Sequence, residues 1–230
     1  GYSLPDTLET VGPYSMAKNY SLSSVSLPDS VINIGRYAFA YDSSLYTVYI
    51  SDTSKLARIS FASFALSGIQ TMRIPANVST VAQYAFEGCK QLTSVTFAAG
   101  SKLQSISAYF FLGCDSIQNI TFENGSALTS IQAHGLEGMK NLTSIDFGDA
   151  RLTNIDNYAF RYCSSLAILN LPDTLINIGR FAFYKCTALS SLTVPETIEH
   201  IGSYAFHGTD NCALYFSGAE LPFYLDENWD

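Results

Sequence analysis

Hydrophobic residues recur along this chain in nine similar copies. When the copies are aligned on one mostly aromatic position, neighbouring copies lie 22 to 25 residues apart. That position holds Met16, Phe39, Phe64, Phe86, Phe111, Leu136, Phe160, Phe183 and Phe206. The residues five and eight places before it are aliphatic in every copy. Repeats of this length are typical of solenoids, in which each unit buries its apolar face only against its neighbours.

Each copy ends in a segment typical of a β-strand. In residues 92–97, LTSVTF, alternation places Val95 and Phe97 on the same face of the strand. A small residue precedes the aromatic in most copies, as Ala38 precedes Phe39, and this favours a tight helical or 3₁₀ turn against the core. Because strands stack at roughly 4.8 Å, the pattern predicts an α/β repeat solenoid of about nine coils with one parallel sheet.

One phrase occurs twice almost unchanged, as NIGRYAF in residues 33–39 and NIGRFAF in residues 177–183. The longer stretch 171–194, LPDTLINIGRFAFYKCTALSSLTV, resembles the line typical of BspA-like leucine-rich repeats, LPdsvtsIGdyAFygCssLtsVtl. The resemblance covers roughly residues 4–216. It implies a right-handed leucine-rich-repeat coil, usually on secreted or surface-anchored proteins of mucosal bacteria and some protozoa. It also implies adhesion or host interaction, since several members are credited with binding extracellular-matrix proteins.

The repeats predict one solenoid domain over residues 1–217. Residues 218–230 depart from the pattern and are predicted to form a C-terminal cap or the start of a following segment. A cap is favoured because the end of a solenoid needs apolar cover, which this tail offers in Leu221, Phe223, Tyr224 and Trp229. Since Gly1 leads directly into repeat-like sequence, we expect a removed leader or further repeats upstream, with Gly1 as a cloning remnant.

The charge balance excludes several classes of partner. The net charge is -8, with only 12 Lys and Arg residues. Nucleic-acid binding needs a concentrated basic footprint, and an anionic membrane surface attracts the same kind of patch. No run of about 18 uncharged apolar residues occurs, so membrane insertion of this segment is not expected.

Four cysteines share one place in the repeat, three residues after the aromatic: Cys89, Cys114, Cys163 and Cys186. Same-column residues of adjacent coils lie close enough for a disulfide, so Cys89 with Cys114 and Cys163 with Cys186 are open pairings. Asn, Asp, Ser and Thr fill this column in other copies, which favours a small hydrogen-bonding position with free, buried thiols. The fifth cysteine, Cys212, lies apart, and no C-x-x-C motif occurs.

No motif for catalysis or metal binding stands out. His134, His200 and His207 occupy scattered repeat positions, and neither a G-x-S-x-G motif nor a P-loop is present. We therefore expect no cofactor and no metal. A column of aromatic residues from Tyr14 to Tyr204 is a candidate sugar platform, but its recurrence favours repeat packing.

The predicted sheet surface is the most informative part of the chain. Its outward positions are 27 residues, mostly uncharged, with charge only at Arg73 and Asp146. Four residues on adjacent strands stand out as a candidate binding patch: Tyr46, Tyr49, Gln70 and Arg73. Aromatic residues with Arg are typical of interaction hot spots, and Tyr49 and Arg73 share a column in which a cation–π contact can form. The alternative is that these residues only stabilise the sheet by cross-strand pairing.

These observations predict a non-enzymatic, extracellular or cell-surface recognition module whose partner is a host protein or glycan. One alternative is a structural spacer that presents another domain, in which case no surface patch would matter. A remote alternative is an enzyme with a site in the C-terminal tail, where Asp226, Glu227 and Asp230 form the only acidic cluster. Acidic residues at a chain end are usually just solvated.

Overall fold

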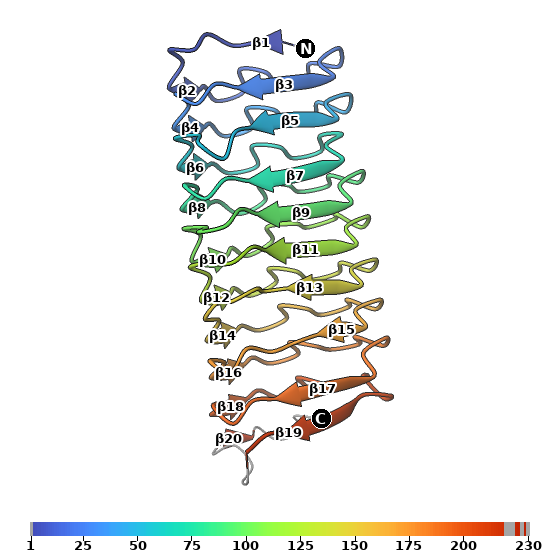
Figure 1. Ribbon diagram of the computed structural model, residues 1–230. Helices are drawn as coiled ribbons and strands as arrows, with labels where there is room; N and C mark the ends of the chain where they lie inside the picture. Colours follow the sequence, from blue (N-terminus) through green and yellow to red (C-terminus); the bar gives the residue numbers. More distant parts are fainter. Residues whose placement is uncertain (1, 219–223, 226–227, 229–230) are drawn as a thin grey trace.

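The computed structural model describes residues 2–218, 224, 225 and 228. The chain winds into coils that stack in sequence order, so that β1 and β19 lie towards opposite ends of the stack (Figure 1). Each coil contributes a longer strand, usually of four residues, and a two-residue strand on the other side. The repeat solenoid predicted from the hydrophobic columns is confirmed, with about nine coils.

The longer strands are β1 Tyr2–Ser3, β3 Ser24–Leu27, β5 Thr47–Ile50, β7 Thr71–Ile74, β9 Ser94–Phe97, β11 Asn119–Phe122, β13 Ser144–Asp146, β15 Ile168–Leu169, β17 Ser191–Val194 and β19 Ala213–Phe216. The shorter strands are β2 Thr10–Val11, β4 Asn33–Ile34, β6 Arg58–Ile59, β8 Thr80–Val81, β10 Ser105–Ile106, β12 Ser130–Ile131, β14 Asn154–Ile155, β16 Asn177–Ile178, β18 His200–Ile201 and β20 Tyr224–Leu225.

The strands pair in parallel with the same residues of the next coil. In the longer set, Val25 lies opposite Val48 and Phe97 opposite Phe122. Three ladders result, in the orders β1-β3-β5, β7-β9-β11-β13-β15 and β17-β19. The first interruption falls at the third repeat, which is one residue shorter before its strand. There Gly68 passes so close to the carbonyl oxygen of Ser43 that an added Cβ would lie 2.2 Å from it.

The shorter strands form a second set of parallel ladders that the sequence did not predict. Their orders are β2-β4-β6-β8 and β10-β12-β14-β16-β18-β20. The aliphatic column five residues before the aromatic supplies the second residue of each strand from β2 to β18, so that Ile34 lies opposite Ile59. A strand of two residues shows no alternation, and the pattern therefore marked these positions as core without marking them as strand.

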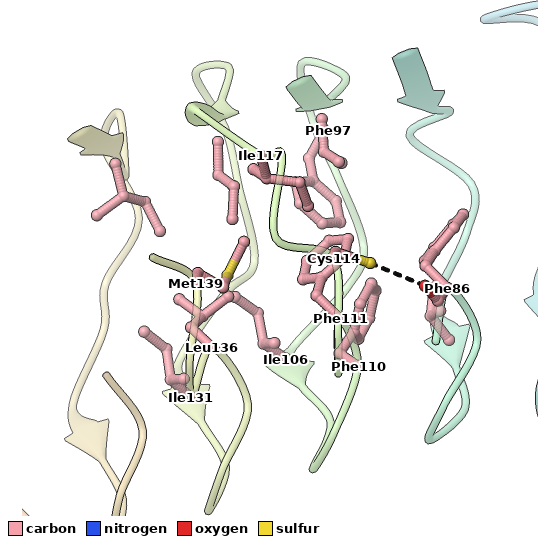
Figure 2. Close-up of a cluster of buried hydrophobic side chains, with 14 of the residues drawn as sticks. Phe86, Phe97, Ile106, Phe110, Phe111, Cys114, Ile117, Ile131, Leu136 and Met139 are labelled. Carbon is pink, nitrogen blue, oxygen red and sulfur yellow. Dashed lines mark hydrogen bonds between the residues drawn. The ribbon is translucent and has the colours of Figure 1, made fainter. Parts of the chain in front are cut away.

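The main core is a continuous hydrophobic cluster to which the strands of both sides contribute, such as Val25 of β3 and Ile34 of β4. Its centre is the aromatic column, where Phe39 and Phe64 stack at 5.3 Å between ring centroids, and Phe64 and Phe86 at 5.4 Å. Figure 2 shows the middle of the stack, where Leu136 replaces the aromatic ring of this column. The column side chains named here are at least 99 % buried: Phe39, Phe64, Phe86 and Leu136.

The predicted helical or 3₁₀ turns are wrong: across the described residues the chain contains no helix, and none that could cross a bilayer. The turn instead places residues in the left-handed region, with φ of 54° at Tyr37 and 65° at Tyr41. The amides of Tyr37, Phe39 and Tyr41 each donate to a carbonyl of the next coil, at 3.2, 2.8 and 2.8 Å. Residues in the left-handed conformation cannot continue a right-handed helix, and here alternate N–H groups of the turn point towards the next coil. The turns of adjacent coils are therefore joined by a ladder of hydrogen bonds.

The four column cysteines are free and buried, as the sequence favours. Each thiol lies within hydrogen-bond reach of a backbone carbonyl of the preceding coil. Cys114 Sγ, for example, donates to the Phe86 oxygen at 2.8 Å (Figure 2). Burial raises the pKa of Cys186 to about 12, which keeps this thiol protonated near neutral pH. The column therefore joins adjacent coils by hydrogen bonds, not by disulfides.

The tail contributes to the second set of ladders. The backbone of Tyr224 and Leu225 forms β20, which pairs in parallel with His200 and Ile201 of β18. Three of the residues that favour a C-terminal cap, Leu221, Phe223 and Trp229, lie outside the described residues. The division between a solenoid over 1–217 and a tail over 218–230 therefore stays a prediction.

Candidate functional site

The four residues nominated from the sequence lie together on the side of the longer strands. Tyr49 belongs to β5 and Arg73 to β7, and these strands are neighbours in the stack. Tyr46 and Gln70 precede the two strands and are joined through their backbones, since the Gln70 amide donates to the Tyr46 carbonyl at 3.1 Å. Tyr49 is 63 % exposed and Tyr46 is 40 % exposed, so both rings reach solvent.

Arg73 is fixed by two carboxylates. Its Nε and Nη2 donate to the two oxygens of Asp52 at 2.9 and 3.0 Å, and its Nη1 and Nη2 donate to the two oxygens of Glu123 at 2.7 and 3.0 Å. These hydrogen bonds raise the pKa of Arg73 above its ordinary value, and the bond from Arg73 lowers the pKa of Glu123. The guanidinium is therefore held in one orientation beside the tyrosines.

The expected cation–π contact between Arg73 and Tyr49 is not among the contacts that the described residues make. The cation–π contacts of the described residues lie on the turns. Arg161 and Tyr158, for example, are 4.8 Å apart from guanidinium carbon to ring centroid. Two carboxylates compete for the same guanidinium, and a fork of four charge-assisted hydrogen bonds is stronger than an exposed cation–π pair. The exposed aromatic part of the patch is thus Tyr46 and Tyr49.

The rest of the strand surface carries a charge at Asp146 and is otherwise mostly uncharged, and some of its hydroxyl groups already form hydrogen bonds. Thr93 Oγ1 donates to the Gln70 carbonyl at 3.0 Å, and Thr143 Oγ1 donates to the Gln118 carbonyl at 3.1 Å. These hydroxyls bond to carbonyls of the preceding coil that also accept from the backbone amides of the same two threonines. Recognition on this surface would therefore depend on the exposed aromatic rings and on the remaining free hydroxyls.

The aromatic column on the turns forms an almost unbroken stack. Tyr14 and Tyr37 are parallel at 5.0 Å, and Tyr84 and Tyr109 are parallel at 5.3 Å. At the third coil, where Ala62 fills the column position, Phe61 takes its place between Tyr37 and Tyr84. A sugar platform needs a free ring face, but along most of this column neighbouring stacked rings cover the faces. This geometry favours the packing interpretation.

A second ionic cluster, on the turns, was also not predicted from the sequence. His134 stacks between Tyr109 and Tyr158 at 4.8 Å from each, and its Nδ1 is hydrogen-bonded to the Glu137 carboxylate. Arg161 Nε donates to the same carboxylate at 2.6 Å from the following coil. Only the repeat period itself, which places Glu137 and Arg161 in one column, could have indicated this pairing.

No group of three or more His, Cys, Asp or Glu side chains among the described residues is placed to hold a metal ion. The acidic cluster proposed for an enzyme site, Asp226, Glu227 and Asp230, lies outside the described residues.

The sequence matches a known repeat family. The model for the BspA-type leucine-rich repeat region, in six copies, matches residues 2–93 and 83–213. The chain belongs to this repeat family. No curated protein matches its sequence.

Solved structures share the architecture at low identity. A leucine-rich cell surface protein from Faecalibacterium prausnitzii is 19 % identical, with a TM-score of 0.50 over 91 % of this chain and 63 % of its own. The pneumococcal vaccine antigen PcpA is 16 % identical, with a TM-score of 0.46 over 99 % of this chain and 78 % of its own. This BspA-type chain thus spans less than two thirds of the first of these structures, and at such identities the likeness concerns the fold alone.

Proposed function

We propose that this chain is a non-enzymatic recognition module, displayed on a cell surface or secreted, that adheres to a host protein. The single observation that carries the proposal is the pair of exposed rings, Tyr46 and Tyr49, beside the immobilised guanidinium of Arg73. Large aromatic side chains contribute most of the binding energy in many interfaces. The pairing of β5 with β3 holds the backbone of Tyr49, and two carboxylates hold the Arg73 side chain, so little ordering entropy would be lost there on binding.

The comparisons support the location. One solved structure of this fold is named as a leucine-rich cell surface protein and another as a pneumococcal vaccine antigen. We extend this location to the present chain as part of the proposal. In this account the coils supply a rigid scaffold and no chemical step.

The test compares three proteins in binding to immobilised extracellular-matrix proteins and mucin. The first is the parent, the second carries Tyr46→Ala and Tyr49→Ala, and the third carries Tyr215→Ala. Tyr215 is a matched control because it has the strand position of Tyr49 in the last coil and is 60 % exposed. We expect the double variant to lose at least about tenfold in affinity and the control to keep parental affinity.

Equal binding by all three proteins would contradict the proposed patch. Absence of any bound matrix protein or mucin would favour the alternative of a structural spacer, in which the strand surface has no partner.

A further inference from the structure

The turn position two residues after the aromatic column has a similar backbone conformation in every coil, but its side chain differs widely from coil to coil. It has a positive φ in all nine coils, where its occupants are Lys18, Tyr41, Leu66, Gly88, Gly113, Gly138, Tyr162, Lys185 and Gly208. Glycine adopts this conformation without steric penalty, whereas other L-residues are strained in it. Three consecutive glycines therefore leave the column bare between Leu66 and Tyr162.

A groove of about 500 Å³ lies over the bare part of this column. Gly113 and Gly138 line it, and a Cβ added at Gly138 would meet no atom within 4 Å, so the space above that glycine is open. Leu112 and Tyr162, which are 38 % and 39 % exposed, supply its large apolar side chains. This volume is in the range of sites for small organic ligands.

Polar side chains follow one wall of the groove, four residues after the aromatic column in successive coils: Asp115, Lys140, Ser164 and Thr187. Thr187 Oγ1 donates to the Ser164 carbonyl at 3.2 Å. Within the described part of the chain, neither the Asp115 carboxylate nor the Lys140 ammonium forms a side-chain hydrogen bond or an ion pair. An acceptor and a donor are therefore available beside an apolar floor.

The ring of Tyr162 is held at its place by its neighbours. The guanidinium carbon of Arg161 lies 5.1 Å from the ring centroid and the ammonium of Lys185 lies 5.9 Å from it. The ring of Tyr184 meets Tyr162 edge-on at 5.5 Å. No side chain projects from Gly138 in the preceding coil, so the ring borders the open space of the groove.

Two kinds of occupant fit this geometry poorly. An extended peptide binds through unpaired strand edges, but the floor amides already have partners, as when Gly138 N donates to the Arg161 carbonyl at 2.7 Å. An amphipathic helix needs a continuous apolar groove, whereas only Leu112 and Tyr162 are large and apolar here.

A glycan matches the remaining chemistry, because a sugar ring has an apolar face and a rim of hydroxyls. We propose that this groove binds a short oligosaccharide, with one sugar ring over the open glycine floor beside Tyr162 and its hydroxyls bonded to Asp115 and Lys140. The site lies on the turns of the fifth to eighth coils. It is separate from Tyr46 and Tyr49 and goes beyond the proposed adhesion to a host protein.

The test uses the whole chain and a panel of soluble neutral and acidic tri- and tetrasaccharides, with saturation-transfer NMR and titration. Tyr162→Gly removes the ring at a position whose backbone favours glycine, and Asp115→Asn removes the charged acceptor. Tyr41→Gly is the matched control, because Tyr41 has the same column and a φ of 65° against 63° for Tyr162, and is 42 % exposed. Circular dichroism confirms that each variant folds.

We expect at least one oligosaccharide to bind the parent, with about tenfold weaker binding to Tyr162→Gly, a smaller loss for Asp115→Asn and parental binding to Tyr41→Gly. The proposal is overturned if no member of the panel binds, or if Tyr162→Gly and Tyr41→Gly behave alike. It is also overturned if only a peptide or protein ligand depends on Tyr162. None of these results bears on the strand-side patch, which is tested with its own variants.

Discussion

Arg73 and Glu123 are joined by two hydrogen bonds of 2.7 and 3.0 Å, although the coil that carries β9 lies between theirs. The second oxygen of Glu123 also accepts from the amide of Ala99 in that intervening coil, at 2.9 Å. With Asp52 on its other side, one guanidinium links the second to the fifth coil. The link crosses the point between β5 and β7 where the strand ladder is interrupted.

Glu123→Gln should lower the thermal stability by a small amount that shrinks as salt is added. The carboxylate is close to solvent, so added ions screen its interaction with Arg73. The measurement is the melting temperature in low and in 0.5 M sodium chloride. Glu196→Gln is the control, because this exposed glutamate makes no ion pair within the described residues. A loss that is equal for both variants, or independent of salt, would contradict the clamp.

Asp42 makes stability depend on pH. This side chain is fully buried, one oxygen accepts from the Asn19 amide at 2.6 Å, and among the described groups its Oδ2 has no partner. Burial raises the pKa of Asp42 from 3.8 to about 6 in the folded state. The folded chain therefore binds the proton more tightly, and this contribution to stability is complete below about pH 4 and lost as pH rises through 6.

Asp42→Asn should consequently be more stable than the parent at pH 7.5, by up to about 3 kcal/mol, and nearly equal to it at pH 4. Urea unfolding of both proteins at the two pH values gives the difference, in which the other titrating groups cancel. A difference that does not change with pH, or a less stable variant at pH 7.5, would show that this carboxylate is not desolvated.

Features of the fold that depend on residues close together in the sequence could be predicted, and features that depend on distant residues could not. The nine copies and the buried columns followed from apolar spacing alone, because every coil repeats it. The left-handed turns did not, since Tyr37 and Tyr162 stand where glycine would have marked a positive φ. The hydrogen bonds between Arg73 and Glu123 were not predicted, because the two residues are 50 positions apart. In a solenoid each coil is expected to contact only the coils next to it, and these two belong to coils with another between them.

Gly202 has the repeat position of the glycine in the NIGR phrase, four residues before the aromatic, and it is required by the close approach of adjacent coils. A Cβ at Gly202 would lie 2.5 Å from the Arg180 nitrogen and 2.8 Å from the Gly179 carbonyl carbon. Both are backbone atoms, so the coils would have to separate. Gly202→Ala should cost about 3 kcal/mol, against about 1 kcal/mol for Gly138→Ala, which meets only left-handed strain.

Urea unfolding of these two alanine variants checks the ranking. A Gly202→Ala variant as stable as Gly138→Ala would mean that adjacent coils are spaced more widely than described.

The cysteines should differ sharply in reactivity. Cys212 is partly exposed, whereas the four column thiols are buried. In the native chain at pH 8, a thiol reagent such as dithionitrobenzoate should modify Cys212 alone, and all 5 cysteines should react after unfolding without reductant. A count below 5 in the unfolded chain would reveal a disulfide, and rapid native reaction of several thiols would contradict their burial.

The most direct test of the stacked coils is a measured distance between two residues on coils far apart in the stack. Spin labels at Ser26→Cys in β3 and Thr193→Cys in β17, in a Cys212→Ser background, replace two exposed residues of one strand column, seven coils apart. At roughly 4.8 Å per coil, pulsed electron paramagnetic resonance should give a distance of about 34 Å. A distance below about 20 Å would contradict a single stack.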